Sequence, residues 1–322
     1  MARVFTDRRR RVSLVVCALA VVAAASCRSG PADGRPRIGL VMKSLANEFF
    51  LEMERGAREH QGARSDQYEL LASGIKDEVD VAAQISLVEQ LVTQRVQAIV
   101  LAPADSKALV TVVQRALDAG VVMVNIDNEL DAGVLEERGI RVPFVGPDNR
   151  KGARLAAEVL TKTLPAGAPV AIIEGLPTAF NGVQRRLGFE DAVREAGLRL
   201  VASQAGDWDT AKANQIAAAV LGEHPDVRAL FCANDSMALG AVAAVRAAGR
   251  EGVVQIVGFD NIPAVRDLVR DGRVAATVDQ HAGQLAVFGI EYALDILRTN
   301  GTPSDRETPV DVVTKASLAS SD

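Results

Sequence analysis

The sequence is poor in the residues that most often carry metal binding and covalent chemistry. It has three cysteines, three histidines and one tryptophan among 322 residues, and aromatic residues make up only 4% of it. The histidines His60, His224 and His281 are scattered along the chain and form neither a zinc-ligand set nor a catalytic triad. We therefore expect no metal, no cofactor and no catalytic residue.

Positive charge and nucleotide-binding loops are also scarce. The formal net charge is −5, whereas proteins that bind nucleic acids usually present a basic surface. No Gly-x-Gly-x-x-Gly follows an expected strand, and no Gly-x-x-x-x-Gly-Lys occurs. These absences argue against a nucleic-acid partner, a dinucleotide site and a Walker-type phosphate loop.

The first 26 residues resemble an export signal. Arg8 to Arg11 form a positive segment, and the apolar run 12–25 has the length of a signal-peptide core but is short for a membrane span. Ala24-Ala25-Ser26-Cys27 then resembles a bacterial lipobox, in which Cys27 would be acylated after cleavage. The alternative is an ordinary secretory signal that is cut at a small residue.

We expect a lipoprotein signal peptide over 1–26, lipidation at Cys27 and a tether over 27–36, which is short, polar and rich in Gly and Pro. The protein would then be periplasmic or on the cell surface, anchored to a membrane by lipid. Cys17 would leave with the signal, so no disulfide framework is possible. Cys232 is expected in the core as a small apolar residue.

From residue 37 onward, expected strands and helices alternate, and the pattern restarts near residue 146. Such alternation forms βαβ units with parallel sheets, so we expect an α/β fold of two similar Rossmann-like lobes. The expected strands cover 37–42, 68–72, 97–101, 121–126, 144–145, 170–174, 198–203, 227–231, 253–258, 274–278 and 310–313. The expected helices include 47–60, 79–94, 106–119, 150–164, 182–196, 211–222, 263–271 and 283–297.

The segment 227–240 shows how strand ends supply polar groups. A buried strand is followed by Asn234 and Asp235, where an apolar helix must begin. Ligands bind at the carboxyl ends of strands in open α/β sheets, but Asn and Asp are also favoured helix N-caps. We assign the cap to Asp235 and expect Asn234 to face a cleft.

The same arrangement recurs after other strands, and the residues converge on one cleft if the two sheets face each other by their carboxyl edges. Together they combine acceptors, donors and flat apolar faces, which suits a small neutral polyhydroxylated ligand. The set comprises Asp127 and Asp260 as acceptors, Lys43, Arg185 and Gln280 as donors, Asn47, Asn128 and Asn234 as both, and Phe49, Phe50 and Trp208 as flat faces.

Several of these residues also have an ordinary structural interpretation. Asn47 would cap its helix, alone or besides binding a ligand, and Lys43 would be solvated at the rim. One of the two phenylalanines would belong to the core, and Arg186 is interpreted as a surface or supporting residue. Asp260 is the hardest to explain without a ligand, because a buried carboxylate needs partners.

Five motifs occur in order and carry a resemblance to a known family. They are Lys43-x-Leu45-x-Asn47-x-Phe49-Phe50, Val201-Ala202-Ser203-Gln204 with Asp207-Trp208-Asp209, Cys232-Ala233-Asn234-Asp235-x-Met237-Ala238-x-Gly240, Val257-Gly258-Phe259-Asp260 and Ala276-Thr277-Val278-x-Gln280. With them, residues 37–315 resemble the ribose/allose-type periplasmic sugar-binding proteins, the solute receptors of ATP-driven (ABC) importers. The resemblance implies the type I periplasmic-binding-protein fold, in which a three-strand hinge joins two lobes that close on the sugar.

The resemblance also implies boundaries and sugar contacts. The chain would cross between lobes near 145–147, 280–282 and 308–311. The N-terminal lobe would comprise 37–145 plus 282–308, and the C-terminal lobe 146–281 plus 309–322. The family's sugar contacts would fall on Asn47, Phe49, Phe50, Asp127, Arg185, Trp208, Asn234, Asp260 and Gln280.

Three features bear on which sugar is implied. Lys43 is typical of allose-type members, and Asn128 stands where ribose-type members have Arg. The segment 176–182 departs from both types, so a polyol or cyclitol ligand stays open. We add Lys43 and Asn128 to the predicted contacts.

The implied function is a monomeric receptor that binds a monosaccharide, presents its closed form to the membrane subunits of an ABC permease and catalyses no reaction. A chemosensory or quorum-signal receptor for a furanone-like ligand is an alternative. A regulator of the lac-repressor type would need an N-terminal helix-turn-helix where this sequence has an export signal. An enzyme on a doubly wound sheet would need a nucleophile elbow, a phosphate loop or an acid–base pair.

Overall fold

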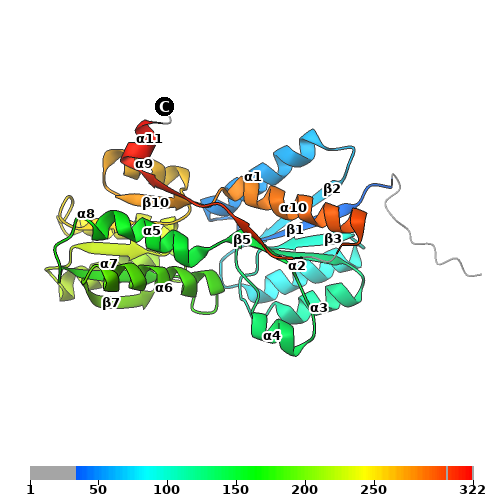
Figure 1. Ribbon diagram of the computed structural model, residues 1–322, viewed down its shortest axis with the longest axis horizontal. Coiled ribbons are helices and arrows are strands. Elements are labelled where there is room, and N and C mark those ends of the chain that lie inside the picture. Colours follow the sequence, from blue (N-terminus) through cyan, green and yellow to red (C-terminus); the bar gives the residue numbers. More distant parts are fainter. Residues whose placement is uncertain (1–33, 302–303, 321–322) are drawn as a thin grey trace, which may run out of the picture.

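The computed structural model describes residues 34–301 and 304–320, which form two lobes side by side (Figure 1). The predicted signal peptide 1–26, Cys27 and most of the predicted tether lie outside the described residues. Within the described residues, no helix combines the length and apolar character that crossing a membrane would require.

The first lobe is built on a parallel sheet of six strands. The strands are β1 (Arg37–Ser44), β2 (Glu69–Ile75), β3 (Ala98–Leu101), β4 (Val122–Ile126), β5 (Phe144–Pro147) and β11 (Arg306–Thr308). Their order is β11-β5-β4-β3-β1-β2, and every neighbouring pair is parallel. The helices of this lobe are α1 (Glu48–Ala63), α2 (Val81–Thr93), α3 (Val110–Asp118), α4 (Ala132–Glu137) and α10 (Ala282–Thr299).

The second lobe repeats this plan. Its strands are β6 (Pro169–Glu174), β7 (Arg199–Ala205), β8 (Ala229–Cys232), β9 (Gln255–Val257), β10 (Ala276–Asp279) and β12 (Asp311–Thr314). They lie in the order β12-β10-β9-β8-β6-β7, and only β12 runs antiparallel to its neighbour. The helices are α5 (Asn149–Thr161), α6 (Phe180–Glu195), α7 (Thr210–Glu223), α8 (Asp235–Ala247), α9 (Pro263–Asp271) and α11 (Lys315–Ala319). The predicted α/β fold of two similar lobes is confirmed.

Three connections carry the chain between the lobes (Figure 1). After β5 the chain enters α5, which packs on α6, and after β10 it enters α10, which packs on α1. The third connection joins β11, paired with β5, to β12, paired with β10. These crossings lie near the three predicted positions, while the lobe boundaries, residue by residue, stay a prediction.

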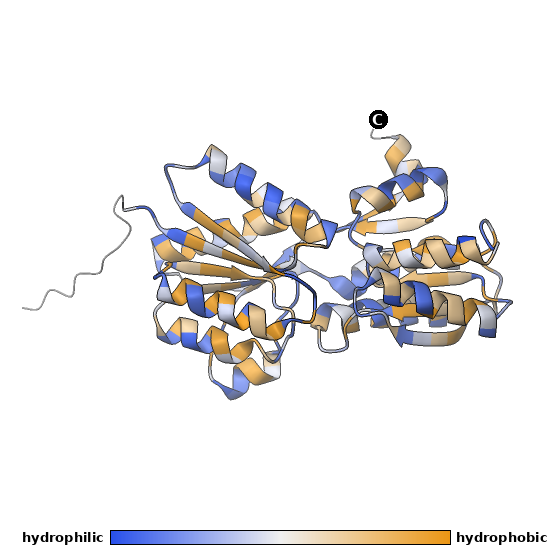
Figure 2. Ribbon diagram, turned by 180° about the vertical axis from the view of Figure 1, so that it is seen from behind, coloured by the Kyte–Doolittle hydropathy of each residue, from blue (hydrophilic) through white to orange (hydrophobic). Residues whose placement is uncertain are grey.

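Burial explains the composition of the strands. Seven of the eight residues of β1 are buried, and all four of β8 are, because helices cover both faces of each sheet. Figure 2 shows the result: apolar strands lie inside each lobe, and the outer helix surfaces carry hydrophilic residues. Cys232 is a fully buried residue of this core, as predicted.

Some predicted bounds were wrong for identifiable local reasons. The helix predicted from residue 106 begins only at Val110, because the Asp105 side chain accepts hydrogen bonds from the backbone of Lys107 and Ala108 and holds a turn there. The short helix α4 was not predicted, although Asp131 caps it at Val134 N. The strand predicted over 68–72 runs on to Ile75.

Candidate functional site

A small pocket lies between the lobes, where the carboxyl ends of the strands of both sheets meet. Its N-terminal-lobe wall comes from β1, α1 and the turns after β2 and β4. Its C-terminal-lobe wall comes from α6 and the turns after β7, β8 and β9. The lining residues are Lys43, Asn47, Phe49, Phe50, Glu78 and Asp127 on one side and Asn181, Arg185, Trp208, Asn234 and Asp260 on the other.

Lys43 is a buried cation in this wall. It is only 3% exposed, so the interpretation of a solvated rim residue is wrong. Its Nζ lies 3.2 Å from Asp127 Oδ2 and 3.9 Å from Glu78 Oε2. The same nitrogen stands 5.4 Å from the ring centre of Phe50 and 5.5 Å from that of Trp208. Lys43 thus links the two lobes through the Trp208 ring of the opposite wall.

Asn47 both caps a helix and lines the pocket. Its Oδ1 accepts from Phe49 N at 3.0 Å, which satisfies a free N–H at the start of α1. Its Nδ2 donates to Glu78 Oε1 at 3.2 Å. Phe49 and Phe50 follow directly; both are buried and both line the pocket.

Glu78 and Asn181 line the pocket but were not among the predicted contacts. Glu78 follows the carboxyl end of β2. That position could have marked it as a pocket residue, but the predicted strand 68–72 ended too early to place Glu78 at a strand end. Burial raises the pKa of its carboxyl, and the nearby Lys43 opposes that shift. Asn181 is the second residue of α6. It lies in the segment 176–182, which departs from both the ribose-type and the allose-type sequences.

Arg185 and Asp260 form a buried ion pair. Arg185 Nη1 lies 3.3 Å from Asp260 Oδ1 and also donates to Ala233 O at 3.0 Å. Its guanidinium stacks 3.7 Å from the ring centre of Phe259, and its Nε donates to Asn149 Oδ1 at 2.8 Å. Burial lowers the pKa of Arg185, but a guanidinium starts so far above neutrality that it stays charged. The pair therefore presents a fixed cation to the pocket.

Asp260 is held in an unusual backbone conformation. Its φ is +121°, a region that residues other than glycine rarely adopt. Its N donates to Val278 O at 2.8 Å, and Gln280 Nε2 donates to its Oδ1 at 2.7 Å. Burial raises the pKa of Asp260 well above its usual value, while Arg185 opposes the shift. Asp127, with φ +62°, and Trp208, with φ +66°, are also in the left-handed region, and such residues gather at functional sites.

Asn234 and Asp235 have roles different from those predicted. Asn234 is the N-cap, since its Oδ1 accepts from Met237 N at 2.9 Å, and it lines the pocket as well. Asp235 is fully buried beneath it and accepts from Thr277 Oγ1 at 2.8 Å and from Ile262 N at 3.0 Å. The assignment of the cap to Asp235 was therefore wrong. Burial raises the pKa of Asp235 to about 7.

Two predicted contacts lie next to the pocket and not in its lining. Gln280 is buried and reaches the site through Asp260. Asn128 is fully buried, donates to Pro103 O at 2.9 Å and accepts from Asn181 N at 3.0 Å, so it bridges the lobes. Arg186 pairs with Glu174 and Glu190 on the outside of the site.

Trp208 fits against the C-terminal-lobe wall because two glycines leave room for it. A Cβ at Gly175 would lie 2.0 Å from the indole, and one at Gly182 would lie 3.1 Å from it, closer than packed carbons approach. The side chain is only 5% exposed and also stands 5.6 Å from the Arg185 guanidinium carbon. Its flat face thus forms part of the pocket floor.

Buried polar atoms without a hydrogen-bond partner gather at this pocket. Those in its lining are Glu78 Oε2, Asp127 Oδ2, Asn181 Oδ1 and Trp208 Nε1, and Gln280 Oε1 lies beside it. A buried group left without a partner costs about 1–3 kcal/mol. The pocket therefore offers several acceptors and one donor to a ligand that can satisfy them.

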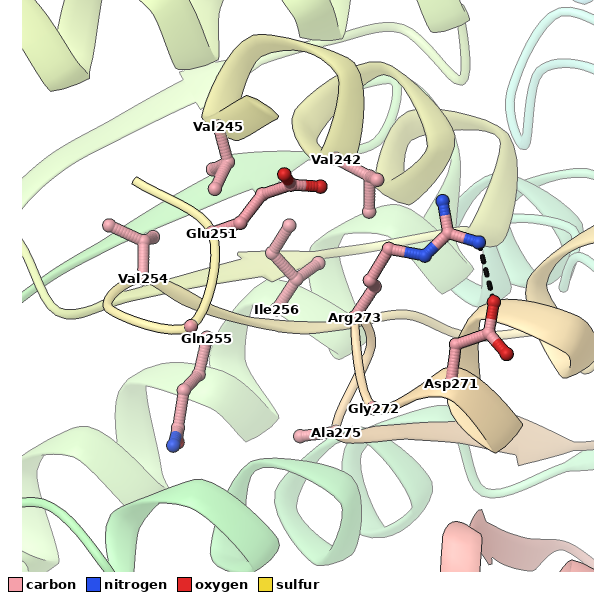
Figure 3. Close-up of a pocket in the computed structure, with 11 residues that line it drawn as sticks. Val242, Val245, Glu251, Val254, Gln255, Ile256, Asp271, Gly272, Arg273 and Ala275 are labelled. Carbon is pink, nitrogen blue, oxygen red and sulfur yellow. Dashed lines mark hydrogen bonds and ion pairs between the residues drawn. The ribbon is translucent and has the colours of Figure 1, made fainter. Parts of the chain in front are cut away.

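One larger hollow in the described part of the chain contains none of the buried polar atoms that lack a hydrogen-bond partner. Figure 3 shows this hollow, which lies between α8 and the starts of β9 and β10, where Arg273 points toward Asp271 and pairs with it. It lies at the amino ends of the strands, opposite to where ligands bind in open α/β sheets. Within the described residues, no group of His, Cys, Asp and Glu could hold a metal ion.

Comparison with known proteins supplies independent findings. Residues 38–302 match the family described as periplasmic binding protein domain. A D-ribose/D-allose-binding protein of Pseudomonas aeruginosa is 53% identical over 312 residues, which cover 96% of this chain and 98% of the relative.

Solved structures agree. An ABC transporter solute-binding protein from Burkholderia multivorans, with an unknown ligand, superimposes with a TM-score of 0.86 at 54% identity, covering 87% of this chain and 100% of that one. An ABC transporter periplasmic solute-binding protein from Actinobacillus succinogenes with bound D-allose gives a TM-score of 0.84 at 34% identity, covering 89% and 100%.

Proposed function

The chain belongs to the periplasmic binding protein family, and from this premise we propose that it is the sugar-binding receptor of an ABC importer. It binds one monosaccharide of the ribose and allose class between its lobes. The relative named for D-ribose and D-allose, at 53% identity, supports this choice of ligand class.

One observation carries the proposal: buried polar atoms of both lobes that have no hydrogen-bond partner meet at a single small pocket. Glu78, Asp127, Asn181 and Gln280 offer oxygen acceptors, and Trp208 offers an N–H. A monosaccharide carries several hydroxyls, each able to donate and accept, and apolar C–H faces that suit Phe49, Phe50 and Trp208. Each carboxylate–hydroxyl bond contributes about 1.5–3 kcal/mol, so a few of them support a micromolar dissociation constant, which is about −8 kcal/mol.

The balance of charges in the pocket favours a neutral ligand. The pocket holds two cations, Lys43 and Arg185, against the carboxyls of Glu78, Asp127 and Asp260. The cations are already neighbours of carboxyl oxygens, so a sugar acid or sugar phosphate would add repulsion without gaining a free cation. Neutral aldoses, polyols and cyclitols fit this balance.

The receptor acts by lobe closure and not by bond cleavage. A ligand that contacts both walls binds the closed form better, and so shifts the open–closed equilibrium toward it. The closed form is then the state that the membrane permease receives. We divide the moving bodies as 37–145 plus 282–308 and 146–281 plus 309–322.

A thermal-shift screen is expected to identify the ligand. At about 100 times its dissociation constant, a sugar that binds only folded protein adds about 2.7 kcal/mol, or several degrees in the unfolding midpoint. We expect D-allose or D-ribose to raise the midpoint and sugar acids to leave it unchanged. A panel extended to polyols, inositols and furanone signals tests the alternatives, and a response to furanones with none to sugars would overturn the proposal.

We also propose that Cys27 carries a lipid that anchors the protein outside the cytoplasm, since Ala24-Ala25-Ser26-Cys27 precedes the folded part. Cells fed a fatty-acid probe are expected to label the full-length protein and not its Cys27→Ser variant. Cys232→Ser serves as the matched control and should stay labelled, because Cys232 is buried in the core. An unlabelled wild-type protein that is released as a soluble product contradicts the anchor.

A further inference from the structure

The start of α6 is capped from the opposite lobe. The first N–H groups of a helix have no partner inside it and usually bond to a side chain at the N-cap. The N-cap of α6 is Ala179, which has no side chain able to accept a hydrogen bond. Instead, Phe180 N donates to Ser106 Oγ at 2.9 Å and Asn181 N donates to Asn128 Oδ1 at 3.0 Å.

These two acceptors belong to one rigid group of the N-terminal lobe. Asn128 Nδ2 donates to Ser106 Oγ at 3.2 Å and to Pro103 O at 2.9 Å. Ser106 N also donates across the cleft to Thr178 O at 3.1 Å. Ser106 is 5% exposed and Asn128 is fully buried, so water does not compete for these bonds while the lobes are together.

The capped residue Asn181 is also a pocket residue. Its backbone is fixed by Asn128, and its side-chain Oδ1 lies in the pocket without a partner. One helical turn further along α6, Arg185 carries the ion pair with Asp260. The cap from the other lobe thus sets the position of a helix that supplies two residues of the ligand site.

We propose that Ser106 and Asn128 are positioning residues that cap α6 only when the lobes are closed. This inter-lobe cap raises the fraction of ligand-free protein that is closed, and it holds Asn181 in position to contact the ligand. When the lobes separate, Phe180 N and Asn181 N lose their acceptors and depend on water. The inference rests on the proposed sugar-binding function for its effect on affinity, but the effect on closure is independent of any ligand.

Trp208 supplies a direct readout of closure. It is the only tryptophan in the sequence, it is 5% exposed, and the N-terminal lobe covers it through Lys43. In sugar-free protein, Ser106→Ala is expected to increase quenching of this fluorescence by acrylamide, because the open form is more populated. D-allose binding should weaken by roughly three- to tenfold, the range that a lost helix cap gives. Faster dissociation should account for most of this change.

A second variant separates the cap from damage to the fold. Ala179→Ser gives α6 an N-cap of its own in both the open and the closed form, so it removes the advantage of closure without changing any residue of the N-terminal lobe. We expect increased quenching and weaker D-allose binding with an unfolding midpoint in urea that is unchanged or higher. Thr163→Ala is the matched control, because it removes a hydroxyl that bonds only within the C-terminal lobe, to Leu160 O at 2.9 Å.

The outcomes are distinct. If acrylamide quenches Ser106→Ala and Ala179→Ser as it quenches the wild type, and both bind D-allose with wild-type affinity, the inter-lobe cap has no influence on closure and the inference is wrong. If no sugar binds the wild-type protein, the proposed function fails, while the quenching comparison still decides the cap. Asn181→Ala keeps the backbone N–H, so it should weaken D-allose binding with unchanged quenching in sugar-free protein.

Discussion

Asp260→Ala is expected to weaken sugar binding at least a hundredfold while the protein still folds. A carboxylate at the end of β9 can accept from two sugar hydroxyls, and each such bond contributes about 1.5–3 kcal/mol. Losing about 3 kcal/mol raises the dissociation constant by roughly a factor of 100. Asp260→Ala leaves the buried Arg185 without its charged partner, which costs stability. Folding should survive this loss because Arg185 keeps its bonds to Ala233 O and Asn149 Oδ1 and its stacking on Phe259.

Calorimetric titration with the sugar identified in the thermal-shift screen measures this loss. Asp267→Ala is the matched control: its carboxylate is 74% exposed and pairs with Arg270 on the surface of α9, so its removal should leave binding unchanged. Asp260→Asn keeps one oxygen acceptor and should fall between the two. Micromolar binding by folded Asp260→Ala protein would show that the pocket between the lobes is not the sugar site.

The sequence was a good guide to four pocket residues that follow buried strands. Asp127, Trp208, Asn234 and Asp260 stand at strand ends, and the order of strands brings those ends together. The hydrophobic periodicity of a segment and the position of a residue just after it predict such placement, because parallel strands share one carboxyl edge. The motifs then added the lobe order, which periodicity alone does not give.

The sequence was a poor guide where a residue's role depends on a partner far along the chain. Asn128 matches a family contact position, yet its partner is the start of α6, 53 residues later. Asp is a residue type favoured at N-caps, but the Asp235 carboxyl accepts hydrogen bonds from Thr277 and Ile262 in the core. Asn234 is the N-cap instead. Neither outcome follows from local propensity, because both depend on how two separate segments approach each other in three dimensions.

Arg185→Met is expected to destabilise the protein by about 3–5 kcal/mol, the cost of leaving a buried charge without its partner. Arg185 is the cation nearest Asp260, and it also faces the charges of Asp127 and Asp235. Urea unfolding at pH 8 measures the loss. Arg186→Met on the same helix is the matched control; that side chain is 29% exposed and should cost less than about 1 kcal/mol.

The pH dependence of this loss tests its electrostatic origin. Burial already raises the pKa of Asp260 in the folded protein, and Arg185 opposes the shift, so Arg185→Met raises that pKa further. A group whose pKa is higher in the folded state holds its proton there and releases it on unfolding, so its contribution to stability is full at low pH and lost as pH rises. The variant should therefore be less impaired at pH 5 than at pH 8. Adding Asp260→Asn removes the main titrating group, and should restore part of the stability at pH 8 and reduce the pH-dependent part of the loss. The remainder comes from Asp235, whose pKa Arg185 also holds down. An equal loss at both pH values, with no recovery in the double variant, would mean that Arg185 stabilises the fold through packing on Phe259 and not through its charge.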